Sequence, residues 1–551
     1  MLYKDLYNYY YINSIMNTMN TMNATNDNKS ENVLLKNKHI LICIGENDKI
    51  QNRNKLYASE YEYIKQNFCG IVLSEEDSID SYLSGTNDVF VKVNVSTLNT
   101  SDTSNVSNTL NTFKNVTRFG SGSKSKSGSG SGSGSESGSE SESESESGSE
   151  SESESGSDRD VIVYLCGDID RITDKLVDLK NRFIYVIKEL SYNYNDDSDI
   201  YNVIDLGRVP INIHNVGVYF REFFAPGTNY FNVIKNEHQF QKLTESNKSS
   251  NAFRKGIYLS HVDKNNSGLT FNLLRCSSNL SGATDNFRDT DNFIISELND
   301  TSKHFFREKV KFNHVLAQIY ENTKPSYMYS LFTSFVNMVW FFVFGKNFFS
   351  MKNTEKKAKI RAHSDKTKDM PRNAIMAFCT FYNSYNKESG KNIFVDDRLR
   401  DIRRTNEDLF DCCYRNTSAL TKLHFRLKDT VTDKNLEKEF SITLYPNSVF
   451  MMSLSTNRLY THEIKPSLLP VDKIPTRMGY VVRCSDTKAL FVNNKTHILE
   501  NNDAIPLRKI TDDDMAQIRE LYLKENVTDE IVEYKQIYCS MNTGDYKKPY
   551  L

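Results

Sequence analysis

Closely paired cysteines are missing from this sequence. Its nine Cys include the adjacent Cys412 and Cys413, but no CxxC. Because a zinc knuckle and a disulfide framework both need regular pairs, the sequence supports neither. The Cys are expected to be reduced thiols in a cytoplasmic or nuclear-type compartment. The first residues also lack a basic stretch followed by an apolar run, so no signal peptide is predicted.

A large excess of charge is missing as well. The net charge is -2, and the tract 119–157 alone carries eight Glu and two Lys. Removing the -6 of this tract leaves +4 for the rest of the chain, which is mildly basic. A dedicated nucleic-acid binder carries a larger positive charge, although a nucleic-acid substrate remains compatible with this one. Hydrophobic residues make up only 38% of the chain, so part of its length is expected not to fold.

One apolar run is long enough to cross a bilayer, residues 327–349. It contains Ser, Thr and Asn side chains and Lys346, and the sequence on both sides of it belongs to one predicted domain. We therefore expect a buried core helix, with Trp340 in the core, rather than a membrane anchor. A membrane is not an expected partner.

The first two hundred residues are predicted to contain a small α/β unit. Residues 1–37 are expected to be disordered, and the unit is assigned to 38–97 and 159–210, with a helix at 171–183 and a strand at 89–95. Residues 98–158 are a Ser/Gly/Glu low-complexity tract, which cannot bury apolar surface and is expected to be a flexible linker. The unit carries neither GxGxxG nor GxxxxGK[ST], so no function is predicted for it.

Short strand-like runs dominate residues 211–500, and several alternate apolar and polar positions. The order of elements predicts an α+β fold with a double-layered sheet core. Residues 501–551 are predicted to form a C-terminal helix at 512–526, with acids early and a Lys late, followed by a tail.

The sequence AHSD places His363 and Asp365 two residues apart on a predicted strand. Because alternate residues of a strand share a face, both side chains can meet at one point. Two His and one carboxylate form the facial triad of non-haem iron(II) sites, which leaves three metal positions open. The HxD motif alone is weak evidence for a metal site, since a single His in a strand more often has a structural role.

A second His and two Arg strengthen the pattern. His462 follows a hydrophobic strand and a predicted polar turn. Further on, Arg477 and Arg483 lie six residues apart on a predicted strand, so they share a face. A guanidinium binds a carboxylate bidentately, which suits the distal carboxylate of 2-oxoglutarate.

These blocks resemble a known family. NSVFMMSLSTNRLYTHEI is similar to the strand–turn–His block of the AlkB-like 2-oxoglutarate and iron(II) oxygenases, and TRMGYVVR is similar to their Arg-x5-Arg strand. The resemblance covers about 350–490. It implies a double-stranded β-helix (jelly roll) with flanking helices, iron(II) bound by His363, Asp365 and His462, and 2-oxoglutarate and O2 as cosubstrates.

The resemblance also implies roles for the two Arg and shows two departures. Arg477 would bind the distal carboxylate of 2-oxoglutarate, and Arg483 would lie nearer the metal. The family's Asn-x-Tyr pair before HxD is absent from MKNTEKKAKIRAH, and Gly479 stands where a polar residue often helps to hold the cosubstrate. The implied reaction is hydroxylation of a C–H bond, or demethylation when the C–H belongs to an N-methyl group.

Three readings of the function stay open. The first is an oxygenase acting on DNA or RNA, with a rim of basic residues that binds phosphates. Residues 254–290 would then form a lid over the substrate, in which Arg275 and Tyr258 contact a base extruded from the nucleic acid. A protein or peptide hydroxylase with the same metal centre is the second, and an inactive structural or membrane-tethered protein is the third. The basic residues of the predicted rim are Lys352, Lys356, Lys357, Lys359, Arg361, Lys366, Lys368 and Arg372.

Two remaining features have plain interpretations. His424 alternates with apolar positions and is expected to face solvent from its strand. The Asn-, Tyr- and Lys-rich composition with a low-complexity insertion resembles that of proteins from large DNA viruses or AT-rich protists. Neither feature assigns a substrate or an oligomeric state.

Overall fold

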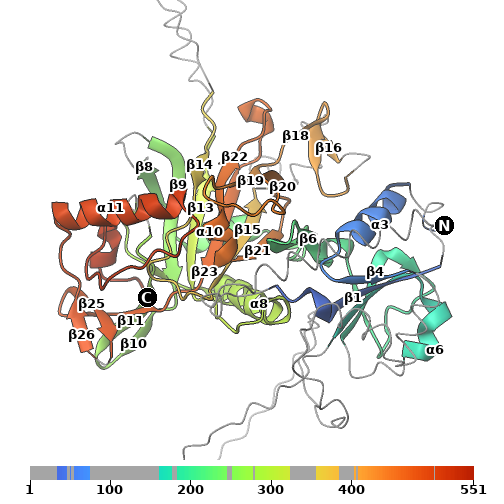
Figure 1. Cartoon of the computed structure of the whole chain (residues 1–551), viewed down its shortest axis with the longest axis horizontal. Helices are drawn as coiled ribbons and strands as arrows, with labels where there is room; N and C mark the ends of the chain where they lie inside the picture. Colours follow the sequence, from blue (N-terminus) through green and yellow to red (C-terminus); the bar gives the residue numbers. More distant parts are fainter. Residues whose placement is uncertain are drawn as a thin grey trace, which may run out of the picture. The chain divides into compact units, whose positions relative to one another are not determined.

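The protein is a sheet-rich mixed α+β molecule (Figure 1), seen in a computed structural model. Its described residues are 34–45, 50, 55–74, 161–176, 183–244, 251–276, 280–322, 355–383, 402–404, 408–501 and 503–551. The apolar segment 327–349 with Trp340, the predicted strand 89–95 and the linker 98–158 lie outside them. None of the helices described in these ranges is long and apolar enough to span a bilayer.

The N-terminal α/β unit is built on a five-stranded parallel sheet. β1 (His39–Ile44) is buried along its whole length, as expected for a strand covered on both faces. α3 (Lys55–Asn67) follows β1 in the chain. Of the predicted helix 171–183, α6 (Thr173–Leu176) is helical, Phe183 already belongs to a strand, and 177–182 lie outside the described residues. The other strands are β2 (Ile71–Leu73), β3 (Ile162–Asp168), β4 (Phe183–Tyr192) and β5 (Asn202–Ile204).

A nine-stranded sheet forms the centre of the following region. Its middle strands consist of apolar runs that are buried throughout, as expected for strands that are covered on both faces. In order across the sheet, the strands are β12 (Asp285–Asn286), β9 (Asn251–Ser260), β13 (His314–Tyr320), β23 (Arg477–Arg483), β15 (Ile375–Tyr382), β21 (Ser448–Ser453), β7 (Gly217–Phe220) and β6 (Ile211–Ile213), with β8 (Gln241–Thr244) paired to β9.

A four-stranded antiparallel sheet lies against one face of the large sheet. Its strands are β14 (Ile360–His363), β22 (Tyr460–Lys465), β19 (Lys422–Leu427) and β20 (Glu439–Thr443), in that order. β22 alternates buried and partly exposed residues, as a strand with one covered face should. The rings of Phe425 and Phe450, one from each sheet, have centroids 5.7 Å apart. The aromatic core therefore lies between the two sheets.

Two helices cover the opposite face of the large sheet, α7 (Tyr230–Glu237) and α8 (Asp289–Phe305). The ring of Tyr230 packs on Phe381 of β15 at 5.3 Å. The hydroxyl of Tyr480 on β23 donates to the Oδ1 of Asp291 on α8 at 2.7 Å. Because side chains alternate along a strand, Tyr480 projects away from the face that carries Arg477 and Arg483.

The C-terminal part adds a further antiparallel sheet and a helix. The sheet joins β10 (Asp263–Asn265) and β11 (Gly268–Leu273) to β24 (Thr487–Val492), β25 (Lys495–Glu500) and β26 (Asp503–Pro506). This sheet pairs strands from both sides of residue 500, where the sequence predicted the end of the 211–500 region and the start of the C-terminal part. α11 (Asp512–Val527) lies within one residue of the predicted helix. Three short strands complete the described strands, β16 (Ile402–Arg404), β17 (Cys412–Tyr414) and β18 (Thr417–Ser418).

Candidate metal centre

The structure brings together His363, Asp365 and His462, with one ligand atom of each within 4.8 Å of the others. β14 and β22 are neighbours, and His363 is paired directly with His462 across them. The centroids of the two imidazole rings are 4.5 Å apart, and the Nε2 of His363 is 3.6 Å from the Oδ1 of Asp365. Two His nitrogens and one carboxylate oxygen thus face a common point at one end of the four-stranded sheet.

The two imidazoles are held in states that suit metal ligation. The Nδ1 of His363 lies 2.9 Å from the carbonyl oxygen of Arg361 and can only donate to it, which leaves the Nε2 lone pair free. His462 is 4% exposed and packs between the rings of Phe378 and Phe425. Burial, followed by the neighbouring His363, lowers the pKa of His462 to about 3, so this imidazole is neutral at pH 7.

Asp365 is fixed by a guanidinium. The Nη2 and Nε atoms of Arg483 donate to its Oδ2 at 2.7 and 3.0 Å, while its Oδ1 faces His363. Burial alone would raise the pKa of Asp365, but Arg483 and the two neighbouring His hold it well below its usual value. One carboxylate oxygen is therefore occupied by Arg483, and the other is turned toward the two imidazoles.

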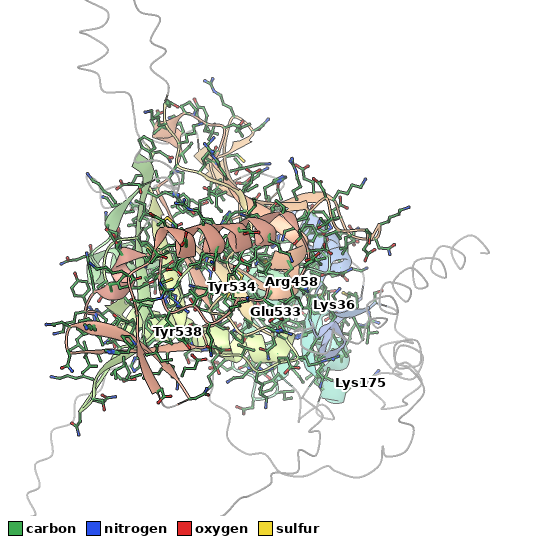
Figure 2. The ribbon with its side chains drawn as sticks, turned by 60° about the vertical axis from the view of Figure 1, so that its left-hand side comes forward. Lys36, Lys175, Arg458, Glu533, Tyr534 and Tyr538 are labelled. Carbon is green, nitrogen blue, oxygen red and sulfur yellow. The ribbon has the colours of Figure 1, made fainter. Side chains whose placement is uncertain are left out.

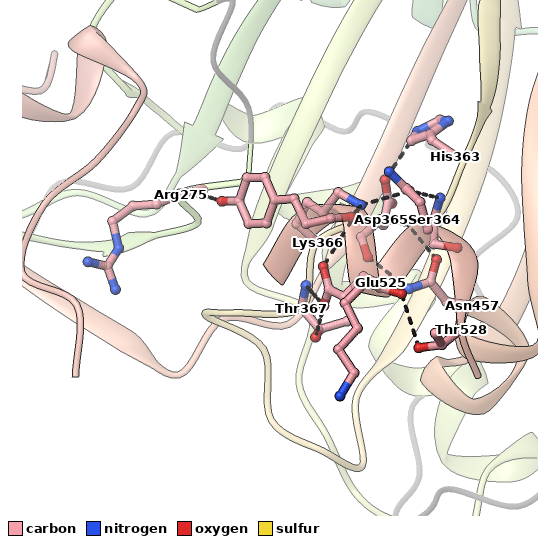
Figure 3. Close-up of polar contacts among 12 residues, drawn as sticks. Arg275, His363, Ser364, Asp365, Lys366, Thr367, Asn457, Glu525 and Thr528 are labelled. Atoms are coloured by element: carbon pink, nitrogen blue, oxygen red, sulfur yellow. Dashed lines mark hydrogen bonds and ion pairs between the residues drawn. The ribbon is translucent and has the colours of Figure 1, made fainter. Parts of the chain in front are cut away.

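The backbone of Asp365 is held by one side chain, Asn457. The Asp365 N–H donates to the Oδ1 of Asn457 at 2.8 Å, and the Asn457 Nδ2 donates to the carbonyl of Asp365 at 2.9 Å (Figure 3). Asn457 lies on α10 (Leu454–Leu459), a short helix at the place where the sequence predicted a polar turn. This helix therefore fixes the backbone position of Asp365, which lies two residues after the end of β14.

α11 supports the same loop from its other side (Figure 3). The Ser364 N–H donates to the Oδ1 of Asn526 at 2.9 Å, and the Thr367 N–H donates to the Oε1 of Glu525 at 3.0 Å. The ammonium of Lys366 donates to the carbonyl of Tyr522 at 3.0 Å. The backbone that carries Asp365 is thus tied to two helices, although it is not itself in a strand.

Arg477 lies at the other end of β23, on the face that carries Arg483. It is 3% exposed, and its Cζ lies 4.8 Å from the centroid of the Tyr320 ring. Its Nη2 is 3.4 Å from the Oγ1 of Thr380, but its Nε and Nη1 are buried without hydrogen-bond partners in the described part of the chain. A buried guanidinium with unpaired N–H groups is suited to binding an anionic ligand.

Gly479 makes room for this guanidinium. A Cβ at residue 479 would lie 3.1 and 3.3 Å from the two Nη atoms of Arg477. The side chain of Arg477 therefore folds along its own strand toward Arg483. The glycine that departs from the family's pattern has a steric role here.

Sequence reasoning missed Tyr320 and Gln318. Both lie on β13, where Tyr320 is paired with Arg477 and Gln318 with Gly479, so their side chains share the face of the site. A tyrosine had been sought directly before His363, but Tyr320 precedes the long segment 323–354. The motif Gln-x-Tyr at 318–320, at the end of an apolar strand, was the signal that could have identified it. Asn457 had no signal, since an Asn in a predicted turn is ordinary.

The predicted base-receiving roles of Arg275 and Tyr258 are wrong. The Nη2 of Arg275 donates to the Oδ1 of Asp369 at 2.6 Å, and its backbone N–H donates to the Oδ2 at 2.6 Å. Tyr258 is 3% exposed, and its hydroxyl lies 3.2 Å from the Sγ of Cys276. Both side chains are parts of the packed interior.

The predicted basic rim is only partly exposed. Lys357 donates to the carbonyl of Ser467 at 3.0 Å, and Lys366 is bound to α11. Arg372 pairs with Glu533. Lys359 and Arg361 are exposed near the metal-site strand, whereas Lys352 lies outside the described residues.

His424 does not face solvent as predicted. It is 5% exposed, its Nδ1 is 2.8 Å from the Oγ of Ser441, and its Nε2 is 2.8 Å from Glu439. Cross-strand pairing places Ser441 directly opposite His424, so the neighbouring polar side chains cover the ring. This His is a structural member of the four-stranded sheet.

Two cavities lie away from the three ligands. One, of about 170 Å³, is lined by residues of α10 and the C-terminal segment, including Asn457, Arg458 and Glu533. Figure 2 shows Arg458, Glu533 and Tyr534 close together beneath α11. A larger cavity of about 480 Å³ includes Lys235 and His238 in its wall.

Comparison with known proteins found similarity among solved structures. Neither a protein-family model nor a curated protein sequence matches the chain. Among solved structures, the chain is similar to the selenomethionine-labelled Fe(II)/(alpha)ketoglutarate-dependent dioxygenase TqaL, with a TM-score of 0.21 and 7% identity over 51% of this chain and 81% of that one. This score is too low to establish a shared fold.

Proposed function

We propose that the chain is an iron(II)- and 2-oxoglutarate-dependent dioxygenase whose metal is bound by His363, Asp365 and His462. The observation that carries the proposal is the convergence of these three ligand atoms within 4.8 Å. Two imidazoles and one carboxylate are the facial ligand set of non-haem iron(II), and they leave positions for cosubstrate and dioxygen. The neutral His462, the ionised Asp365 and the free Nε2 of His363 fit such a metal.

The strand order supports a double-stranded β-helix as the frame of this site. The large sheet contains the run β13-β23-β15-β21, and the small sheet contains β14-β22-β19-β20. Along the chain, β14 lies in the small sheet and β15 in the large one. β19 and β20 are again in the small sheet, and β21, β22 and β23 then lie in the large, the small and the large sheet in turn. A jelly roll is a double-sheet antiparallel fold of this kind.

A role for Arg477 follows from its environment. We assign it to the distal carboxylate of 2-oxoglutarate, because it is a buried guanidinium whose Nε and Nη1 lack partners in the described residues. Arg483 would have a different role, since two of its nitrogens are already bound to Asp365. It would hold the metal-binding carboxylate in place.

When bound, iron(II) would supply the oxidising chemistry with 2-oxoglutarate and dioxygen as cosubstrates: one oxygen atom would enter succinate as carbon dioxide is released, and the other would hydroxylate a substrate C–H. The protein's own residues orient the parts. Arg361 fixes the tautomer of His363, Asn457 and α11 fix the backbone at Asp365, and the rings beside His462 exclude water from one side of the metal.

The substrate class and the AlkB-like subfamily remain proposals from the sequence. A nucleic-acid substrate would use the exposed Lys359 and Arg361. The inward contacts of Lys357 and Lys366, and the surface ion pair of Arg372 with Glu533, reduce the positive surface available to phosphates. A peptide substrate needs no such surface. Salt-sensitive binding of single-stranded DNA or RNA would favour the first, and binding of peptides alone would favour the second.

The test of the proposed function is anaerobic titration with iron(II) in the presence of 2-oxoglutarate. The wild-type chain is expected to give the weak visible charge-transfer band of the iron–2-oxoglutarate chelate, and the double variant His363→Ala/Asp365→Ala is expected to lose it. The matched control is His424→Asn, which removes another buried His from the same sheet and should keep the band. A folded wild-type chain without the band would reject the dioxygenase assignment.

A further inference from the structure

A second group of metal-ligand atoms lies on the helix-covered face of the large sheet. Glu237, His238 and Asp291 each place one ligand atom within 4.8 Å of the others. The side chains of His238 and Asp291 are fully buried. This group belongs to α7 and α8, whereas the three proposed iron ligands belong to β14, the residues after it, and β22.

The ends of two helices position this group. Glu237 is the last residue of α7 and His238 is the residue that ends it, while Asp291 lies in the first turn of α8. The N–H of Arg288 donates to the Oδ2 of Asp291 at 2.8 Å, as part of the cap of α8. Both contributions therefore come from rigid, well-packed positions.

The hydrogen bonds of His238 resemble those of a metal-bound imidazole. Its Nδ1 is 2.8 Å from the Oδ2 of Asp285, and its Nε2 is 2.9 Å from the Oδ2 of Asp291. A carboxylate on the nitrogen away from the metal commonly orients a ligating His. Asp285 would have this orienting role, and the Nε2 of His238 would face the metal together with Asp291.

The distances allow a metal without a large rearrangement. Zinc binds His nitrogen and carboxylate oxygen at about 2.0–2.1 Å. At the tetrahedral angle of a zinc site, two such ligands are roughly 3.3 Å apart. The Nε2 of His238 and the Oδ2 of Asp291, now 2.9 Å apart, would separate by a few tenths of an ångström to admit the metal.

An unsatisfied carboxylate oxygen points to a missing cation. The Oε1 of Glu237 accepts from the Oγ1 of Thr290 at 3.0 Å, but its Oε2 is buried without a hydrogen-bond partner among the described residues. Desolvating a carboxylate oxygen in this way is unfavourable unless a cation compensates it. Three carboxylates, of Glu237, Asp285 and Asp291, gather around one imidazole, which adds to the attraction for a divalent cation.

A cavity of about 480 Å³ lies next to the group. His238 is in its wall with Lys255, Glu321 and Asn322, although the imidazole itself is fully buried. Because a metal site needs an entry path, a metal would enter by a local opening of this wall.

We propose that Glu237, His238 and Asp291 form a zinc site, separate from the proposed iron centre and independent of its assignment. One imidazole and two carboxylates suit zinc(II), since the imidazole disfavours magnesium and calcium. The competing occupant is a proton. Burial lowers the pKa of His238, but hydrogen bonds to Asp285 and Asp291 outweigh it and raise the pKa to about 9, so an imidazolium would fill the same gap.

The experiment is zinc titration of the full-length His363→Ala/Asp365→Ala variant, which removes the first site. We expect one zinc per chain by elemental analysis after dialysis. Adding Glu237→Gln, which keeps an acceptor for Thr290 but removes the charge, should weaken zinc binding at least tenfold. The matched control is Glu297→Gln, a change to another partly buried acid of α8 that pairs with Arg208 outside the group.

No zinc bound by the folded double variant would overturn the proposal and leave His238 as a protonated member of an ion-paired cluster. Equal zinc affinity with and without Glu237→Gln would also overturn it. If the double variant does not fold, the wild-type chain replaces it, and Glu237→Gln is expected to bind one zinc fewer than the wild type. Absence of the iron band in the earlier test would leave this difference unchanged, so the two assignments fail separately.

Discussion

Single residues in the proposed iron site differ in how well their polar atoms are satisfied. Asp365 is bound at its side chain by Arg483 and at its backbone by Asn457. Arg477 is as deeply buried as Arg483, but two of its nitrogens have no partner in the described residues. An unmade hydrogen bond at a buried group costs about 1–3 kcal/mol, more for a charged group. A dicarboxylate would relieve that cost at Arg477, so the two Arg predict different mutational effects.

Arg477→Gln should weaken 2-oxoglutarate binding and spare iron binding. A hydrogen bond to a charged group contributes about 1.5–3 kcal/mol, so the Kd of 2-oxoglutarate should rise roughly 10- to 150-fold. The measurement is titration of the charge-transfer band with 2-oxoglutarate at saturating iron. Arg426→Gln, at an exposed position of the four-stranded sheet, is the control and should leave the Kd unchanged. An unchanged Kd in Arg477→Gln would remove this residue from the cosubstrate site.

Asn457→Ala should weaken iron binding, although this side chain is not a proposed ligand. It removes both hydrogen bonds that fix the Asp365 backbone, and loss of such outer contacts typically costs about 10- to 100-fold in metal affinity. Iron titration of the variant, with circular dichroism to establish folding, measures this effect. Asn435→Ala, in an exposed loop, is the comparison. Equal iron affinity in both variants would mean that β14 alone positions Asp365.

At the scale of elements, helices complete a site that the strands begin. β14 ends at His363, so Asp365 lies beyond regular structure, in a loop held by α10 and α11. The C-terminal helix therefore supports the proposed metal centre through Glu525 and Asn526, although it is far from His363 in the sequence. Its end nearest the loop matters for the site, whereas its other end matters mainly for stability.

Thr511→Ala tests that separation. Thr511 caps α11, accepting from the Asp514 N–H at 3.2 Å, and the Asp514 carboxylate accepts from the Thr511 N–H at 2.9 Å. Losing an N-cap side chain costs about 0.5–2 kcal/mol, so the urea midpoint should fall. Iron affinity should stay within about twofold, because the cap lies roughly four helical turns from Asn526. A drop in iron affinity as large as that of Asn457→Ala would show that α11 acts as one rigid unit.

The predictability of these elements depended on how local their signals were. Strands such as β15 and β21 are apolar runs that can be recognised from their own residues. The two candidate His ligands come together because β14 pairs with β22, which places His363 beside His462. α10 was missed because a helix of six residues is set by tertiary contacts rather than by its own periodicity. Tyr320 was missed for a different reason. Its partnership with Arg477 is created by the pairing of β13 with β23, which no local pattern encodes.

At the scale of the whole molecule, buried histidines couple stability to pH. His39 on β1 is fully buried, stacks on Phe305 of α8 at 4.0 Å, and has its Nε2 3.0 Å from the carbonyl of His304. His314 on β13 is 1% exposed. Burial is the first cause that lowers the pKa of each to about 3. Both are neutral in the folded chain at pH values where the unfolded chain binds a proton on each.

The free energy of unfolding should therefore fall as the pH drops below about 6.5. The folded pKa of His39 lies below its unfolded value, so the unfolded state binds more protons between about pH 3 and 6.5, and stability rises with pH in that window. Each such His contributes a slope of about 1.4 kcal/mol per pH unit, fully developed only below the unfolded pKa. Urea unfolding at a series of pH values from 7 to 5 measures it.

The variant His39→Phe isolates one histidine, because it keeps an aromatic ring against Phe305 and removes the titrating group. Other groups also change stability in this window. Metal-free His462 adds to the acid loss, whereas Asp545, whose pKa burial raises to about 6, opposes it, since its buried carboxyl is favoured when protonated. These contributions are common to both chains and cancel in their difference. The slope of the difference between pH 6 and 5 should therefore approach about 1.4 kcal/mol per unit, and parallel curves would mean that His39 is protonated in the folded state.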